Sequence, residues 1–381
     1  MGPLYLTPSL NIGTVGIDSN VFYTPGERQT DFLAQGGPGL EARLPLGQSV
    51  VLGARGGLGY SYFARTASQR RYTKSLVGFL ELATARTQAR LSAQHSETFQ
   101  RPDFEVDERV FQSARTAELS LRRDAGRVSL LGRGSVQTTE AERGTEFFGA
   151  DLAANLGRDT YRASGGLRIP LTAKTSFVVE AEREWERFLE KSARDFDSNR
   201  FQGGLALESA TRLAGRAVAG VQALRARLGT VTAWHPSAEV DLTYHFSPRT
   251  RLTAGYRFGR TISAFDVSGS TPTARTVAYE LGLEKALWGS FDLRLFGSLR
   301  EFTSDGAVVI VDADGTETSG VRDDRQWSGG ANLGVRLWNA VRVGLEARYS
   351  DRTSTFEDFG VDGLIVGFTI DYSPGELLGF E

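Results

Sequence analysis

The feature that most constrains the fold is an alternation of apolar and polar residues with a period of two, which recurs along almost the whole chain. Near the C-terminus, Leu364, Val366 and Phe368 alternate with small or polar residues such as Gly367 and Thr369. Successive side chains of a β-strand point to opposite faces of a sheet, whereas a helix would give a period of 3.6. The chain is therefore predicted to be all-β. A soluble sandwich and a membrane barrel both fit this pattern alone.

The connections between the alternating segments favour the barrel. Short connections such as "LPLGQS", "FSPRT" and "LWGS" alternate with long polar ones such as "VFYTPGERQTDF" and "FDVSGSTPTART". Short turns at one rim and long loops at the other are typical of outer-membrane barrels. The apolar faces mix Ala, Gly and Leu, whereas a sandwich core needs large, closely packed residues. Aromatic residues such as Tyr60, Phe291 and Tyr372 lie near strand ends, as in interfacial girdles.

The predicted fold is a transmembrane antiparallel up-and-down β-barrel that takes up residues 1–381 as one domain, without a plug or a periplasmic domain. Bacterial single-chain barrels have an even number of strands. Counts from the two termini conflict between 139 and 160, so segment 145–156 is predicted not to be a full membrane strand. This gives about 18 strands, with 16 and 20 as alternatives. The candidate segments are 4–16, 32–44, 48–62, 72–84, 88–99, 110–122, 127–138, 145–156, 160–169, 175–187, 200–210, 214–227, 234–246, 251–264, 275–285, 289–301, 325–337, 340–351 and 360–372.

Composition agrees with this fold and limits the function. The mean hydropathy of −0.25 is compatible with a barrel, because half of each strand faces a wet lumen. No run of about 18 apolar residues is present, so no transmembrane helix is predicted. The formal net charge of −2 gives no reason to expect nucleic acid as a partner. The absence of cysteine excludes disulfides, thiolate metal sites and cysteine nucleophiles.

The polar faces of the strands carry charges of both signs and are predicted to line the pore. Segment 175–187 has four carboxylates on one face, about 7 Å apart, which repel one another unless positive groups face them. Two interpretations stay open. The charges pair across strands and stiffen the wall, or an acidic wall faces a basic wall and the field selects solutes. The predicted pore-lining residues are Glu180, Glu182, Glu184, Glu186, Arg257, Arg294, Arg342 and Arg348. The expected partners of the glutamates are Arg162, Arg168 and Arg216.

No catalytic, cofactor or metal site is predicted, and the protein is not expected to be an enzyme. Of the three histidines, His235 and His245 share a face but lie roughly 33 Å apart along a strand. His95 points away from its neighbour Ser96. None has the nucleophile–base geometry that hydrolysis requires. The acidic stretch Asp312–Glu317 matches part of a calcium loop but lacks the terminal spacing, so a solvated loop is expected.

The first 65 residues or so resemble a known family. The motifs are Pro8-Ser9, "DSNVF" from Asp18, Asp31-Phe32 and "PGL" from Pro38, followed by a short turn and a strand that ends in tyrosine. These features are similar to the outer-membrane β-barrel porins of type 2, many of which are associated with exopolysaccharide and capsule export. The resemblance implies the outer membrane of a Gram-negative-type bacterium. It also implies a passage for polysaccharide that works with a separate periplasmic export partner.

The expected function is an outer-membrane channel for secreted polysaccharide. The alternatives are a general diffusion porin for small solutes and a structural or assembly barrel that partners a surface protein. The expected partners are the lipid bilayer, lipopolysaccharide, a polysaccharide substrate and a periplasmic export protein. The longest connection, Thr303–Arg325, is predicted to control passage, because its middle residues 307–311 are apolar. An outer hairpin is the alternative for those residues.

Overall fold

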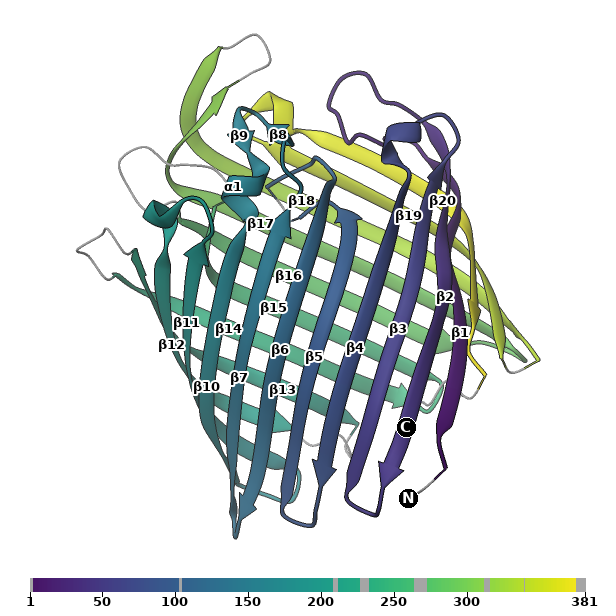
Figure 1. Cartoon of the computed structure of the whole chain (residues 1–381), viewed down its shortest axis with the longest axis vertical. Helices are drawn as coiled ribbons and strands as arrows, with labels where there is room; N and C mark the ends of the chain where they lie inside the picture. The colour runs from purple at the N-terminus through teal and green to yellow at the C-terminus, as the bar shows by residue number, and fades with distance from the viewer. Residues whose placement is uncertain are drawn as a thin grey trace.

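The chain forms a closed antiparallel β-barrel (Figure 1). The structure is a computed structural model that describes residues 3–102, 105–207, 212–226, 233–263, 273–311, 316–338 and 340–374. Within these residues, eighteen strands form one sheet, and the last strand pairs with the first. The predicted all-β barrel of 18 strands is therefore confirmed. No helix in the described part of the chain has the length and hydropathy needed to cross a membrane.

The barrel strands follow one another around the ring in chain order. Most predicted segments match a strand to within three residues at each end; the exceptions are 200–210, 289–301 and 325–337. The predicted ends 208–210, 227 and 264 lie outside the described residues. The strands are β1 (Tyr5–Asp18), β2 (Asp31–Leu46), β3 (Val50–Phe63), β4 (Arg71–Ala83), β5 (Thr87–Gln100), β6 (Val110–Ala125), β7 (Val128–Ala141), β10 (Arg158–Pro170), β11 (Thr175–Phe188), β12 (Phe196–Leu207), β13 (Leu213–Ala226), β14 (Ala233–Ser247), β15 (Thr250–Ile262), β16 (Thr273–Ala286), β17 (Phe291–Val311), β18 (Glu317–Leu337), β19 (Val341–Ser354) and β20 (Val361–Tyr372).

Segment 145–156 is the one candidate that does not enter the barrel. It forms the short hairpin of β8 (Glu146–Phe147) and β9 (Ala150–Asp151), followed by the helix α1 (Leu152–Leu156). The Asp151 carboxylate caps α1 by accepting hydrogen bonds from the backbone N–H groups of Ala153 and Ala154, at 2.9 and 3.3 Å. In Figure 1 these elements lie at the end of the barrel opposite both termini. The prediction that this segment is not a membrane strand is confirmed.

The two faces of the barrel wall have different chemistry. Leu364, Val366 and Phe368 of β20 are exposed on the outer face, whereas Thr369 on the inner face is buried. This agrees with the alternation in the sequence, because apolar groups face lipid and polar groups face the interior. Short turns join the strands at the end near the termini. Gly126, at φ +69°, makes the two-residue turn between β6 and β7.

The seam that closes the barrel depends on close backbone approach. The register of β1 shifts at Ile12/Thr14, a β-bulge that re-aims the side chains beyond it. Gly16 pairs with Gly367 of β20, and a Cβ added at Gly16 would lie 2.0 Å from the Val366 carbonyl oxygen. Glycine is therefore required at Gly16 by the space that the closing strand leaves.

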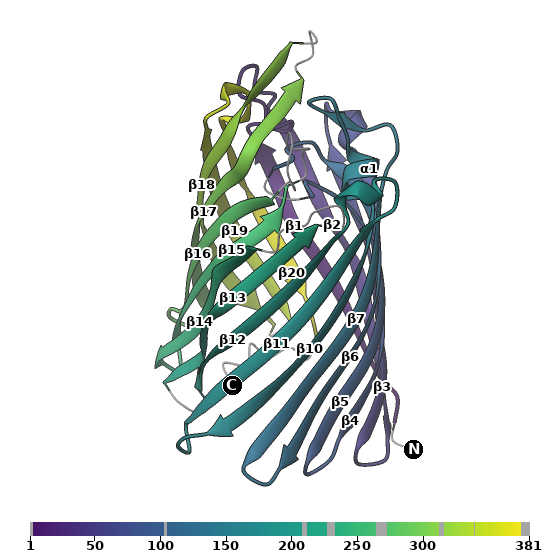
Figure 2. The same ribbon diagram turned by 90° about the vertical axis from the view of Figure 1, so that its left-hand side faces the viewer.

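β17 and β18 extend well beyond the predicted segments, which corrects the interpretation of Thr303–Arg325 as a loop. After a register shift between Thr303 and Ala307, the two strands pair again, with Val308 opposite Gly320. The apolar stretch is therefore strand, as in the outer-hairpin alternative. Figure 2 shows this hairpin projecting beyond the neighbouring strands, and it shows how strongly all strands tilt. Residues 312–315 of the acidic stretch lie outside the described residues.

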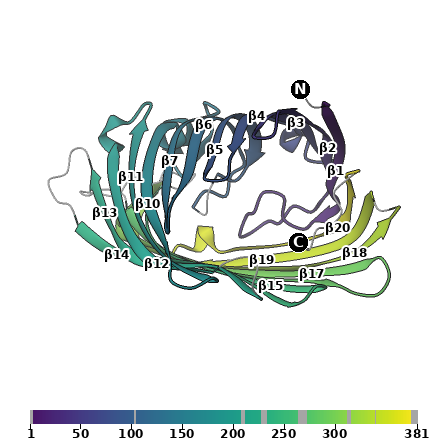
Figure 3. The same ribbon diagram turned by 90° about the horizontal axis from the view of Figure 1, so that it is seen from below.

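The largest apolar core sits at the outer end of the barrel. It joins residues from α1, the β17–β18 hairpin, and the connections β5–β6 and β19–β20. In the view along the barrel the ring of strands is flattened, with β3–β6 on one broad side and β15–β19 on the other (Figure 3). The buried members are Val106, Val110, Leu152, Leu156, Val308, Ile310 and Phe359.

Candidate channel interior

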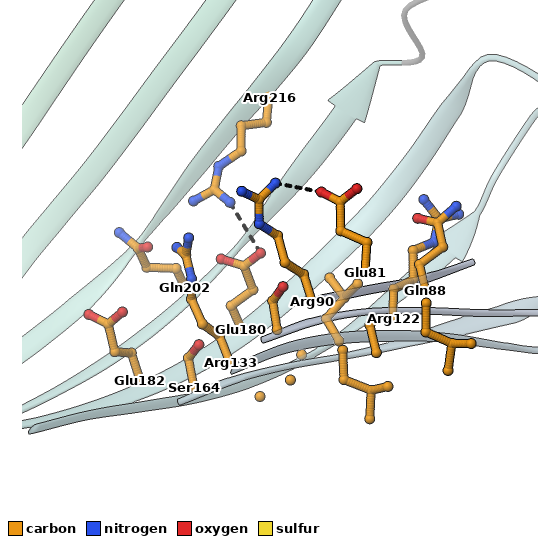
Figure 4. Close-up of a pocket in the computed structure, with 18 of the residues that line it drawn as sticks. Glu81, Gln88, Arg90, Arg122, Arg133, Ser164, Glu180, Glu182, Gln202 and Arg216 are labelled. Atoms are coloured by element: carbon orange, nitrogen blue, oxygen red, sulfur yellow. Dashed lines mark hydrogen bonds and ion pairs between the residues drawn. The ribbon is translucent and has the colours of Figure 1, made fainter. Parts of the chain in front are cut away.

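A polar cavity of about 750 Å³ lies at one end of the flattened ring, against β4–β7 and β10–β14. Figure 4 shows charged side chains from several strands converging on this space. Arg90 of β5 binds Glu81 of β4 at 2.7 Å, and Arg216 of β13 binds Glu180 of β11 at 3.2 Å. Glu180 and Arg216 lie on the two strands that flank β12, and their side chains meet above it. Both side chains therefore lie on the inner face of the wall. Other charged or amide groups at this cavity are Arg122, Arg133, Glu182, Arg200, Gln202 and Glu239.

Each of the four predicted glutamates of β11 has an arginine partner on a nearby strand. The strand alternation places all four carboxylates on one face, and the arginines come from β10, β12 and β13. Two of the three expected partners, Arg162 and Arg216, are in place. The pairs are Glu180–Arg216 at 3.2 Å, Glu182–Arg200 at 3.5 Å, Glu184–Arg162 in direct contact, and Glu186–Arg158 at 3.1 Å.

The predicted arginines on later strands also lie beside carboxylates. Arg257 is 3.6 Å from Asp241 and 3.5 Å from Glu280, so it lies between β14 and β16. Arg348 of β19 binds Glu346 on the same strand at 2.7 Å. Each of these carboxylates lies on the same strand as its arginine or on an adjacent strand, so none comes from the opposite wall of the barrel.

Asp292 of β17 brings the other two predicted arginines together. Arg342 binds this carboxylate at 2.5 Å, and Arg294 lies 4.0 Å from it. The Arg342 guanidinium also donates to Asn332 Oδ1 at 2.6 Å. Arg342 is buried, so it is a structural member of the wall more than a group exposed to solute. Arg294 keeps a more accessible side chain.

The charges are therefore compensated locally and are not segregated into an acidic and a basic wall. Exposed ion pairs contribute only about 0–1 kcal/mol each, so their main effects are to cancel charge and to order the side chains. This arrangement corresponds to the first interpretation, cross-strand pairing. The pore-lining role of the eight residues stays a prediction.

A second interior cavity, of about 910 Å³, was not anticipated from the sequence. It lies along β1–β5 and is lined mainly by uncharged polar groups and glycine. Gly37 is one of the wall residues, and a Cβ there would lie 1.8 Å from the Leu58 carbonyl oxygen. The small polar residues that alternate along β1 and β2 are the sequence feature from which this cavity could have been predicted. The uncharged polar side chains are Ser9, Asn11, Thr14, Gln35, Ser61, Thr73, Ser75, Ser96, Thr98 and Gln100.

Buried charges near the outer end also escaped sequence reasoning. Arg322 and Asp324 of β18 are fully buried and bind each other at 2.6 Å. Arg352 of β19 binds Asp107, which lies in the β5–β6 connection. Burial raises the pKa of the Asp107 carboxyl above its usual range, and the Arg352 guanidinium opposes this shift. The Asp107–Arg352 contact joins residues that are 245 positions apart in the sequence, which no local pattern reveals.

The histidines are dispersed. His95 of β5 lies 3.3 Å from Glu97, while His235 and His245 lie at opposite ends of β14. Among the described residues, no group of three or more histidine, aspartate or glutamate side chains is placed to bind a metal ion.

Solved structures with similar folds are receptors of the outer membrane. The siderophore receptor PirA from Pseudomonas aeruginosa has 12% identity and a TM-score of 0.51, over 97% of this chain and 80% of that chain. PirA from Acinetobacter baumannii has 9% identity and a TM-score of 0.51, over 98% and 81%. A mutant of the ferric enterobactin receptor PfeA from Pseudomonas aeruginosa, in complex with enterobactin, has 9% identity and a TM-score of 0.52, over 98% and 82%. At these identities the similarity concerns the fold alone.

Sequence comparison identifies the family directly. No curated protein matches the chain. The model of the family described as "Putative beta-barrel porin 2" matches residues 1–372, almost the full length of the chain. The match agrees with the closed barrel, its lipid-compatible outer face and its polar interior. The protein is therefore an outer-membrane β-barrel of the Gram-negative type and belongs to the family described as "Putative beta-barrel porin 2".

Proposed function

We propose that this barrel is a passage through the outer membrane for a secreted polysaccharide. The observation that carries the proposal is the interior wall, whose charges are paired locally, while a second cavity is lined mainly by hydroxyl, amide and glycine groups, with charged residues such as the paired Asp18 and Arg109 among them. Such a wall offers many hydrogen-bond donors and acceptors with little net field. A polar, flexible polymer exchanges its water for such groups without being held strongly at one point.

The same observation argues against a strongly ion-selective pore. Selectivity by charge depends on rings or walls of one sign. Here, Glu180 and Arg216 neutralise each other at 3.2 Å, and Arg257 lies between two carboxylates. Water in the lumen and salt weaken the residual field within about 8–10 Å. A solute with uniform polarity is therefore favoured over a small ion.

A general diffusion porin for small solutes is the second candidate. It is favoured by residues 105–110, which reach from the β5–β6 side of the outer end to strands on the opposite side. A fixed constriction there would admit small sugars and exclude a polymer chain.

The proposal includes the expected partners. The apolar outer face is suited to the bilayer, with lipopolysaccharide around its outer half. A separate periplasmic protein would deliver the polymer to the end with the short turns.

The test uses the purified barrel in a planar lipid bilayer, with neutral dextran of graded length added to the periplasmic side. Transient current blocks whose duration increases with chain length are expected for polymer entry. Sulfated dextran of matched length is the control for charge, and a parallel liposome-swelling assay uses a disaccharide. Swelling with the disaccharide, together with no block by any dextran, would favour the diffusion porin and contradict the proposed function.

A further inference from the structure

Residues 105–110 bridge the outer end of the barrel. They lead into β6, yet Glu105 and Asp107 contact residues of the arc β15–β19, which is opposite β5 and β6 in the ring of strands. The Oγ atom of Ser263, which directly follows β15, donates to Glu105 Oε1 at 2.6 Å. In the flattened ring these two sides face each other across the short dimension (Figure 3).

Asp107 fixes the segment to β19. Its carboxylate binds the Arg352 guanidinium, which is almost fully buried. The Nε atom of Arg352 donates to the Phe359 carbonyl oxygen at 2.7 Å. One arginine therefore connects the crossing segment with the β19–β20 connection. All three groups are shielded from water in this arrangement.

Arg322 of β18 forms a second attachment. Its guanidinium donates to the backbone carbonyl of Glu105 at 3.4 Å and binds Asp324 at 2.6 Å. It also lies 3.8 Å from the centre of the Phe359 ring, a cation–π contact. The contacts of Arg322 and Arg352 converge on Phe359, which is fully buried.

At its other end, the β5–β6 connection is attached to the β1–β2 side. Arg109 lies 3.5 Å from Asp18 Oδ2 and 5.0 Å from the centre of the Phe63 ring. Arg101 donates to the Val21 carbonyl oxygen at 3.3 Å. The connection therefore touches both sides of the outer end.

An apolar core joins this segment to three other parts of the chain. Val106 and Val110 of the segment pack in one cluster with α1, the β17 extension and the β19–β20 connection. We call this cluster, together with the two arginine attachments, the outer cap. Its apolar members are Val106, Val110, Leu152, Leu156, Val308, Ile310 and Phe359.

We propose that the outer cap is a gate that closes the extracellular end of the barrel in this structure and opens for passage. The inference rests on the proposed function, since only a channel needs an opening. Removing charges from water costs about as much as their mutual attraction returns, so a buried ion pair adds little net stability. Water reaches the same groups once the cap opens. The apolar members therefore hold the cap closed, because opening exposes their side chains to water, while the hydrogen-bonded strands below stay in place.

The experiment uses the double variant Asp107→Cys/Arg352→Cys. The chain has no cysteine, so these are its only thiols. Losing the ion pair loosens the cap, and we expect single-channel conductance or open probability to rise severalfold. Joining the two thiols with a short bis-maleimide should return the current to the parental level. The matched control is Lys74→Cys/Glu97→Cys, an ion pair at 2.6 Å between β4 and β5, for which neither step should change the current.

A second variant distinguishes a loosened cap from a folding defect as the cause of a change in current. Val106→Asn keeps both arginine attachments and weakens the apolar core, so it should raise the current in the same direction. Heat-modifiable migration on gels shows whether each variant has folded. Folded Asp107→Cys/Arg352→Cys and Val106→Asn barrels that both conduct like the parent would overturn the gate.

Dextran added to the same bilayers separates the gate from the proposed function. If bridging the thiols closes the ion current but dextran never blocks the loosened barrel, the gate is supported and the polysaccharide proposal fails. If dextran blocks the parent and the loosened and bridged variants equally, the passage is supported and the gate is overturned.

Discussion

Leu242 lies near the middle of β14 with its side chain on the outer face, opposite Gly215 and Ala254 on the neighbouring strands. An arginine at the bilayer midplane of a barrel costs about 2–4 kcal/mol, falling toward zero near the interfaces. Leu242→Arg is therefore expected to lower the free energy of unfolding in phospholipid vesicles by an amount in this range. A denaturant titration measures the change.

The adjacent residue supplies the control. Thr243 points to the wet interior, so Thr243→Arg should leave the free energy of unfolding nearly unchanged. Equal effects of the two substitutions would contradict the assignment of the two faces of β14.

The glutamate stripe of β11 leads to a prediction about ion preference. Replacing Glu180, Glu182, Glu184 and Glu186 by glutamine removes the carboxylates that these four arginines bind in the stripe, and Arg216 keeps Glu239 at 3.4 Å. The wall then gains net positive charge, so the reversal potential in a salt gradient should shift toward anions. The shift should shrink as salt is raised, because the Debye length falls from about 10 Å at 0.1 M to 3 Å at 1 M.

Removing whole pairs is the matched control for this change. The eightfold variant that also replaces Arg158, Arg162, Arg200 and Arg216 by glutamine restores the formal charge and should restore the parental ratio. A quadruple glutamine variant with the parental cation/anion ratio at low salt would show that the stripe does not act on the permeating ions.

At the residue scale, the sequence predicts which face of the barrel wall a side chain lies on better than it predicts which residues that side chain contacts. A period of two assigns Glu180 and Leu242 to opposite faces without any structure. It also supplied two of the four arginine partners, because strands adjacent in the chain are adjacent in the barrel. The Asp107–Arg352 and Arg322–Glu105 contacts could not be predicted, since they depend on how long connections fold over the open end.

At the scale of elements, the seam between β1 and β20 gives the sharpest prediction. A Cβ at Gly16 would lie 2.0 Å from the Val366 carbonyl oxygen, whereas a Cβ at Gly78 of β4 has nothing within 4 Å. Gly16→Ala should therefore impair barrel closure, and Gly78→Ala should not. The fraction of heat-modifiable barrel after refolding into detergent or lipid measures this. Equal folding of both variants would contradict the observed register of the seam.

The membrane strands were predictable because each one must alternate and must be bounded by a turn. Segment 145–156 was predicted not to be a membrane strand only because the number of strands in such barrels is even. It forms β8, β9 and α1. The extension of β17 and β18 was expected only as the outer-hairpin alternative for residues 307–311. Beyond the membrane, hairpin residues such as Val308 pack against other connections, so the simple rule of lipid outside and water inside no longer applies.

At the scale of the whole molecule, the protein is a closed barrel with a polar, charge-compensated interior and a cap of connections at its outer end. The fold, the strand number and the membrane location follow from alternation and loop length. The substrate does not, because a polar wall without a specific pocket is compatible with many hydrophilic solutes.

The most direct test of the central claim is the reversal potential of single channels in a planar bilayer with a KCl gradient. It is measured for the parent and for Asp107→Cys/Arg352→Cys. We expect discrete conductance steps with a reversal potential well below the full Nernst value, because the interior charges cancel locally. A reversal potential close to the Nernst value, or the absence of steps in both folded proteins, would contradict it.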